Sequence, residues 1–224
     1  MSFAEKSNGI QVALTGATGM VGGEALRACL ASDRVARVVS FGRRPVDIDH
    51  PKLRQVGLED FDALAGTDVA LYCIGVYTGQ VSDEELRRIT IDMPVAFAEA
   101  LARVRPDAAF CLLSGMGADR TEKSRFAFAR YKGIAENRLA DIGLARFHSL
   151  RPGYIHPTTP RASMTASYRV MSALWPIVRR ILPNAGIESA DLAAGMLRVG
   201  LEGEAKNQVL ENKEIRQWAC SPSS

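Results

Sequence analysis

Apolar, β-branched runs alternate with helix-like stretches along the first two thirds of the chain. The helical patterns lie at about 23–31, at 60–65, before Arg103 and at 126–142. The strand-like runs are Ile10–Thr15, Val35–Phe41, Leu53–Val56, Val69–Ile74, Ala109–Ser114 and Phe147–Leu150. Such alternation is typical of βαβ units, which pack as a parallel sheet with helices on both faces. The pattern therefore predicts an α/β fold with a single doubly wound, mainly parallel sheet.

Local signals place several helix ends. Ser82 stands three residues before Glu85, the spacing of a capping box, and is expected to open a helix. Pro94 is expected in the first turn of a second helical segment, because a proline deeper in a helix would break it. Gly143 is expected to end the 126–142 helix.

The pattern changes after Arg151-Pro152-Gly153. Residues 161–183 carry apolar side chains at helical spacing, including Tyr168, Met171 and Leu174, with an interruption at Pro176. Ser189 is expected to cap a helix through about Leu201, and Val209-Leu210 to form a short last strand. We expect one domain over 1–224, with a core at about 10–155 and a small C-terminal helical cover at about 156–224. A substrate lid and plain core or dimer packing both remain open for this cover.

Composition excludes several classes of protein. A net charge of +3 is too mild to indicate nucleic-acid binding. The scattered Cys29, Cys73, Cys111 and Cys220 show no C-x-x-C spacing, so neither a disulfide framework nor a metal site is predicted. The polar Met1–Gly9 lacks a signal peptide's apolar run, and no stretch reaches the ~20 apolar residues of a membrane span. We expect a soluble, cytoplasmic protein without stable membrane insertion.

The stretch after the first strand carries the strongest chemical signal. Gly16 allows a tight turn, Gly19 allows close approach to a pyrophosphate, and Gly22 allows close packing of helix and strand. The helix that follows offers free N–H groups to phosphates. The predicted dinucleotide-binding residues are Thr15, Gly16, Thr18, Gly19, Met20, Val21 and Gly22. A purely structural turn is the alternative.

The second strand ends in Gly42-Arg43-Arg44, without the acidic residue of an NAD-preferring site. Two guanidinium groups suit a 2′-phosphate, so Arg43 and Arg44 favour NADP(H) over NAD, with solvated surface arginines as the alternative. Asp60 is expected either at the adenine amine or at a helix start. Gly75 is expected either beside the cofactor ribose or in an ordinary turn.

Two later motifs complete a family pattern. Ser114 ends a strand before flexible glycines, where its hydroxyl can bond a substrate carbonyl or form a turn. The chain resembles the short-chain dehydrogenase/reductase superfamily, and within it the atypical, NADP-binding members similar to the Tat-interacting protein, over roughly residues 10–155. The resemblance rests on Thr15-Gly-Ala-Thr-Gly-x-x-Gly22, Gly42-Arg43-Arg44, Asp68-Val69…Cys73-Ile74-Gly75, Leu113-Ser114…Gly117-Ala118-Asp119, Lys132-Gly133…Glu136 and Arg151-Pro152-Gly153.

This resemblance implies a Rossmann domain in which a serine, a tyrosine and a lysine act together. Ser114 and Lys132 take two of these places, and Lys132 would also hold the nicotinamide ribose. The tyrosine place is Phe128, which has no hydroxyl. Tyr131 is the substitute acid, although a position next to Lys132 points about 100° away around a helix. Other side chains that could reach the cleft are Tyr72, Tyr77, Tyr154 and His156.

Two functions follow as alternatives. One is an NADP(H)-dependent oxidoreductase acting on a small carbonyl or alcohol. The other is a catalytically silent, NADPH-sensing regulator or protein-interaction module. A weaker third alternative docks the helix of Trp175 and Arg179-Arg180 on a membrane surface or partner. The substrate is unidentified, and a homodimer is left open.

Overall fold

The main sheet has seven strands in the order β3-β2-β1-β4-β5-β6-β9, and every neighbouring pair is parallel. The computed structural model describes residues 9–76, 79–159, 175–176, 178, 180–182, 184–204 and 206–220. The strands are β1 Ile10–Thr15, β2 Val35–Phe41, β3 Leu53–Val56, β4 Val69–Tyr72, β5 Ala109–Leu113, β6 Arg146–Arg151 and β9 Asn207–Glu211. The order reverses between β1 and β4, as in a doubly wound sheet, which confirms the predicted fold class.

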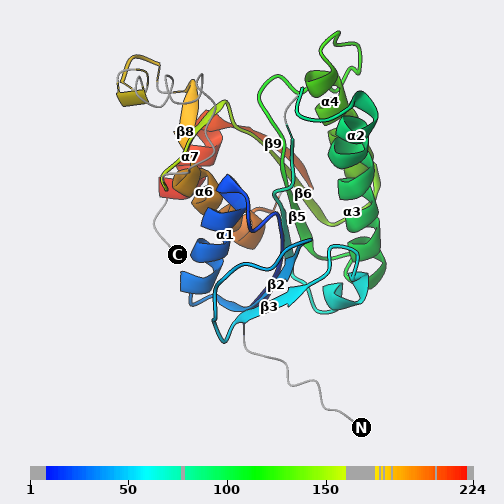
Figure 1. Cartoon of the computed structure of the whole chain (residues 1–224), viewed down its shortest axis with the longest axis vertical. Helices are drawn as coiled ribbons and strands as arrows, with labels where there is room; N and C mark the ends of the chain where they lie inside the picture. Colours follow the sequence, from blue (N-terminus) through cyan, green and yellow to red (C-terminus); the bar gives the residue numbers. More distant parts are fainter. Residues whose placement is uncertain are drawn as a thin grey trace.

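Helices cover both faces of this sheet (Figure 1). One side carries α1 Met20–Ala31, α6 Ser189–Glu202 and α7 Asn212–Cys220. The other side carries the 3₁₀ helix η1 Phe61–Leu64, α2 Asp83–Arg87, the π-helical segment η2 Arg88–Asp92, α3 Met93–Val104 and α4 Ala127–Asp141. The weak helical pattern at 60–65 thus forms a 3₁₀ helix.

The core divides into two clusters because successive strand residues face opposite sides of the sheet. Val12 and Leu14 of β1 pack in the cluster that includes α1 and α6, whereas Ala13 packs in the cluster that includes α3. Phe97 of α3 meets Tyr72 edge-on, with ring centroids 5.8 Å apart. Full burial of such large side chains stabilises the fold by about 1.5–3 kcal/mol each.

Three predicted helix boundaries are confirmed. The Ser82 hydroxyl accepts a hydrogen bond from the Glu85 backbone N–H at 3.2 Å, and Pro94 lies in the first turn of α3. Gly143, with φ at +89°, follows the end of α4. Ser189 differs: Glu188 is the N-cap of α6, and the Ser189 hydroxyl accepts from the Thr158 N–H at 2.9 Å instead.

Other boundaries shift for tertiary reasons. The strand predicted to reach Ile74 ends at Tyr72, and the Cys73 N–H donates to the Thr15 hydroxyl at 3.1 Å. A second, two-stranded parallel sheet of β7 Tyr154–His156 and β8 Gly186–Glu188 was not predicted, because strands of three residues show no periodicity. The predicted positions Tyr168, Met171 and Leu174 lie outside the described residues.

Candidate functional site

The glycine turn closes through contacts that only glycine permits. Gly16 has a φ of +74°, and its carbonyl accepts a hydrogen bond from the Gly19 N–H at 2.8 Å. A Cβ on Gly22 would lie 2.1 Å from the Gly16 carbonyl oxygen. Gly19 is the N-cap of α1, so the bare start of the helix faces the turn. This backbone suits a pyrophosphate, which can approach the helix N–H groups closely.

A pocket of about 600 Å³ opens beside this turn, at the point where the strand order reverses. It is lined by Gly16, Ala17, Thr18, Gly19, Ser40, Phe41, Gly42, Arg43, Arg44, Gly57, Leu58, Glu59, Asp60, Cys73, Ile74, Gly75, Val76, Arg88, Ile89 and Met93. The predicted cofactor residues among them are Gly16, Thr18, Gly19, Arg43, Arg44, Asp60 and Gly75. The fold therefore brings the glycine turn and the paired arginines to one cavity.

The remaining predicted cofactor residues lie outside the lining of this pocket. Thr15 is buried and accepts from the Cys73 N–H, so it ties β1 to the end of β4. The Val21 side chain packs in the core, so only its backbone, in the first turn of α1, faces the predicted cofactor site. Gly22 serves the turn through its packing on Gly16, and Met20 begins α1.

Ser114 faces a buried carboxylate. Its hydroxyl donates to Oε1 of Glu136 at 2.6 Å, and the Ser149 hydroxyl donates to the same oxygen at 2.7 Å. Arg151 donates to both carboxylate oxygens, at 2.9 and 2.5 Å, and Arg120 donates to Oε2 at 2.8 Å. Burial acts to raise the pKa of Glu136, but the hydrogen bonds, that of Arg151 foremost, outweigh it and lower the pKa to about 2. Glu136 is therefore charged at neutral pH.

Glu136 and Arg151 belong to the sequence motifs, but no role was predicted for either. Ser149 and Arg120 were not predicted as site residues at all. Glu136 lies four residues after Lys132, so both share one face of α4. Gly133 allows the loop that carries Arg120 to lie against α4, because a Cβ there would meet the Asp119 carbonyl oxygen at 1.8 Å. The four-residue spacing between Lys132 and Glu136 was the sequence signal that could have identified Glu136.

Lys132 is buried at the end of β5. Its Nζ donates to the Leu113 carbonyl oxygen at 2.9 Å and lies 6.0 Å from the centre of the Phe128 ring. Burial lowers the pKa of Lys132 to about 8, while the charge of Glu136 acts in the opposite direction. The Lys132 amine thus lies at the carbonyl of Leu113, the residue before Ser114, and its pKa of about 8 is close to neutral pH.

Phe128 points its ring tip at Gly115. A Cβ on Gly115 would lie 2.9 Å from Phe128 Cζ, the atom that carries the hydroxyl in a tyrosine. Tyr131 is directed elsewhere: its hydroxyl donates to Asp83 Oδ2 at 2.7 Å and joins α4 to α2. The structure therefore gives Tyr131 a packing contact rather than a place beside Ser114.

The other described aromatic candidates lie in two different ring clusters. Tyr72 is buried against Phe97 and Phe110, and burial raises the pKa of its hydroxyl. Tyr154 and His156 pack against Trp175, each with ring centroids 5.5 Å from it. Tyr77 lies outside the described residues.

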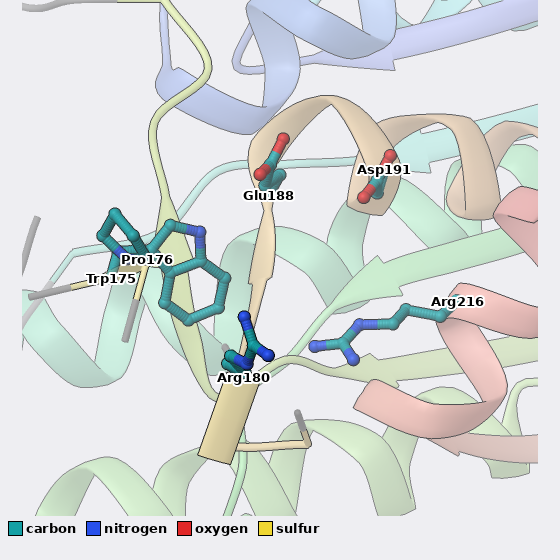
Figure 2. Close-up of a pocket in the computed structure, with 6 residues that line it drawn as sticks. All are labelled: Trp175, Pro176, Arg180, Glu188, Asp191 and Arg216. Atoms are coloured by element: carbon teal, nitrogen blue, oxygen red, sulfur yellow. The ribbon is translucent and has the colours of Figure 1, made fainter. Parts of the chain in front are cut away.

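A second hollow, of about 460 Å³, lies in the C-terminal region (Figure 2). It is lined by Trp175, Pro176, Arg180, Glu188, Asp191 and Arg216. The guanidinium groups of Arg180 and Arg216 point toward each other, and Arg216 donates to the Gly186 carbonyl oxygen. Burial raises the pKa of Asp191, and the neighbouring Glu188 acts in the same direction. None of the predicted site residues lines this hollow.

The described part of the chain lacks two further kinds of feature. No helix there is long and apolar enough to cross a bilayer. No group of three or more His, Cys, Asp or Glu side chains there could hold a metal ion.

No family model matches the chain. Among curated proteins, "Protein fmp52, mitochondrial" of Aspergillus clavatus is 29% identical over 219 residues, which cover 84% of this chain and 92% of the relative. The protein of the same name from Aspergillus niger is 28% identical over 232 residues, covering 92% of this chain and 97% of the relative. Because these relatives are named as mitochondrial, the expectation of a cytoplasmic protein is contradicted.

Solved structures agree on the architecture. Gre2 of Candida albicans in complex with NADPH superposes with a TM-score of 0.68 at 15% identity, over 90% of this chain and 78% of Gre2. A short-chain dehydrogenase/reductase superfamily protein of Agrobacterium tumefaciens with bound NAD gives 0.65 at 16% identity, over 89% of this chain and 76% of that one. The chain therefore shares the Rossmann fold of these structures, and the resemblance read from its motifs is confirmed at the level of the fold.

Proposed function

We propose that the protein binds NADP(H) in the pocket beside the glycine turn. The observation that carries this proposal is the single 600 Å³ cavity that joins Gly16 and Gly19 to Arg43 and Arg44. A dinucleotide needs both parts at once, a close backbone for its pyrophosphate and a recognition site for its adenosine ribose. The residues present fit a dinucleotide. Gly16 and Gly22 form a tight turn in which a Cβ at either position would collide with a backbone carbonyl oxygen.

Each part of the cofactor has a candidate partner. The start of α1 would hold the pyrophosphate, and Arg43 with Arg44 would hold the 2′-phosphate through paired, charge-assisted hydrogen bonds. Lys132 would hold the nicotinamide ribose from the end of β5, where its amine now bonds the Leu113 carbonyl. When bound, the nicotinamide supplies or accepts a hydride.

We further propose hydride transfer to or from a small carbonyl or alcohol as the activity. Ser114 and Lys132 are retained side by side, and Lys132 has a pKa of about 8 that suits proton exchange near neutral pH. The Ser114 proton is held by Glu136, so the oxygen of Ser114 offers a lone pair to a substrate hydroxyl. Such a site orients an alcohol without the usual tyrosine.

The second candidate is a catalytically silent protein that senses NADPH. One observation favours it: Tyr131, which precedes Lys132 in the chain, donates its hydroxyl to Asp83, and the ring beside Gly115 is that of Phe128. Both candidates need the same cofactor pocket, so cofactor binding tests what they share.

Titration calorimetry with NADPH and NADH tests binding. We expect NADPH to bind at least ~10-fold more tightly, a difference of about 1.4 kcal/mol. Replacing Arg43 and Arg44 by alanine should reduce this difference. Arg54→Ala is the matched control, because Arg54 is exposed on the neighbouring strand and does not line the pocket. Equal affinities in the wild type would overturn the preference for NADP(H).

NADPH consumption with a panel of aldehydes, ketones and quinones, and NADP⁺ reduction with the matching alcohols, separates the two candidates. Turnover that is lost in Lys132→Met supports the oxidoreductase. Tight NADPH binding without turnover on any member of the panel supports the silent sensor.

A further inference from the structure

One wall of the cofactor pocket is a π turn. Residues 83–104 form a continuous helix in which α2 and α3 are joined by the π-helical segment η2, Arg88–Asp92. Arg88 and Ile89 of this segment line the pocket together with Met93 at the start of α3. π turns are rare and occur frequently at functional sites.

The π turn directs Arg88 and Ile91 to different surroundings. Ile91 is fully buried in a cluster with Leu86, Tyr131 and Ala135, so this side of η2 is held against α4. Arg88, three residues earlier, faces the pocket instead. The Tyr131–Asp83 hydrogen bond fastens the same helix to α4 one turn before Arg88. The backbone that carries Arg88 is therefore anchored by packing on its other side.

Arg88 has a carboxylate partner on its own helix. Its Nε and Nη2 donate to the two carboxylate oxygens of Glu85, each at 2.7 Å, and both side chains remain partly exposed. The hydrogen bond from Arg88 is the main cause that lowers the pKa of Glu85, and the charge of Arg43 also lowers it. The bond to Glu85 raises the pKa of Arg88, and the charge of Glu59, which also lines the pocket, acts in the same direction. Arg43 and Arg88 both line this pocket, and the Glu85 carboxylate is bonded to Arg88.

We propose that Arg88 is a third guanidinium for the 2′-phosphate of NADP(H), and that Glu85 is the counter-ion that this phosphate displaces or shares. The inference rests on the proposed NADP(H) binding and deepens it. A 2′-phosphate carries up to two negative charges and three acceptor oxygens, so it attracts a guanidinium fork more strongly than one carboxylate does. NADH has no such group, and with NADH the Glu85–Arg88 pair is expected to persist.

The structure offers a matched pair of variants on one helix. Arg88→Ala removes the proposed ligand, and Arg87→Ala removes the preceding arginine, which pairs with Asp92 at 3.1 Å and does not line the pocket. Glu85→Gln removes the competing charge, and Arg88→Lys keeps the charge without the fork. Titration calorimetry with NADPH, NADH, 2′,5′-ADP and 5′-AMP isolates the 2′-phosphate from the rest of the cofactor.

Arg88→Ala should weaken NADPH and 2′,5′-ADP about tenfold and leave NADH and 5′-AMP unchanged, since a hydrogen bond to a charged group contributes on the order of 1.5 kcal/mol or more. Arg88→Lys should restore part of this affinity. Glu85→Gln should tighten NADPH, and Arg87→Ala should change nothing. Unfolding curves confirm that each variant is folded.

Three results would overturn the inference while NADP(H) binding stands. The first is an equal loss of affinity for NADPH and NADH in Arg88→Ala. The second is a loss of NADPH affinity in Arg87→Ala as large as that in Arg88→Ala. The third is unchanged NADPH affinity in both variants. A wild type that binds none of the four ligands overturns the proposed function itself, and with it this inference. That failure is recognised before any variant is compared.

Discussion

The hydroxyl of Ser114 donates to Oε1 of Glu136 at 2.6 Å, so the serine at the end of β5 is part of a buried ion network. Glu136 is fully buried, and Arg151 and Arg120 balance its charge. The network ties α4 to β6 and to the loop after β5. It thereby sets the position of Ser114. It also fixes Lys132, which lies one helix turn before Glu136 in α4.

Glu136→Gln is expected to destabilise the protein by roughly 3–5 kcal/mol. The reason is that Arg151 and Arg120 would lose the carboxylate that compensates their charges, and breaking one side of a buried ion pair carries a cost of this size. Urea denaturation measures the change. Glu99→Gln is the control, because Glu99 is exposed and 3.9 Å from Arg103, and it should change stability by less than about 0.5 kcal/mol. Equal effects would contradict the role given to Glu136.

Acid should remove the same stabilisation in wild-type protein. A carboxyl group whose pKa is lowered on folding, here from 4.5 to about 2, stabilises the fold fully above about pH 5 and loses this effect as the pH falls toward 2. The loss is on the order of 3 kcal/mol. Other carboxyl groups titrate in this range, so the test is the difference between wild type and Glu136→Gln, which should shrink as the pH falls.

Tyr131→Phe should cost about 1 kcal/mol of stability, because it removes the hydrogen bond to Asp83. A double-mutant cycle with Asp83→Asn should show that the two changes are not additive. Turnover per folded molecule should stay unchanged. A complete loss of turnover at unchanged stability would instead make Tyr131 the catalytic acid.

Phe128→Tyr should create or raise carbonyl reduction by about 100-fold, the contribution of a well-placed general acid. The new hydroxyl would extend from Cζ toward Gly115, next to Ser114, on the same helix as Lys132. Phe126→Tyr is the control, since Phe126 is exposed at the start of α4. Fast reduction by the wild type, unaffected by Phe128→Tyr, would contradict this prediction.

Gly22→Ala should weaken NADPH binding more than tenfold, because the added Cβ at 2.1 Å from the Gly16 carbonyl forces the turn open. In Gly23→Ala the Cβ would lie 3.3 Å from the Ala17 carbonyl, and a gain in helix propensity of about 1 kcal/mol offsets this contact. Calorimetry and thermal melting of both variants separate the loss of binding from the loss of stability. Equal affinities would show that the turn does not contact the cofactor.

Local pattern was enough for much of the fold. The strands of the main sheet are short apolar runs, and Ser82, Pro94 and Gly143 act on helix ends only a few residues away. The small β7–β8 sheet was missed because three-residue strands carry no period. Ser189 was assigned to a cap because its partner Thr158 lies 31 residues away. Residues that satisfy one another at long range leave no local signal.

The sequence by itself determined the glycine turn, the paired arginines and the phenylalanine at the tyrosine place, because these depend on residue identity at fixed spacing. Tertiary structure alone decided what surrounds them. The pocket gathers the turn after β1, the end of β2, the loops after β3 and β4, and a π turn. Glu136 receives donors from Ser114 after β5, from β6 and from the loop of Arg120. Tyr131 is turned to Asp83, 48 residues away, because burial requires its hydroxyl to find a partner.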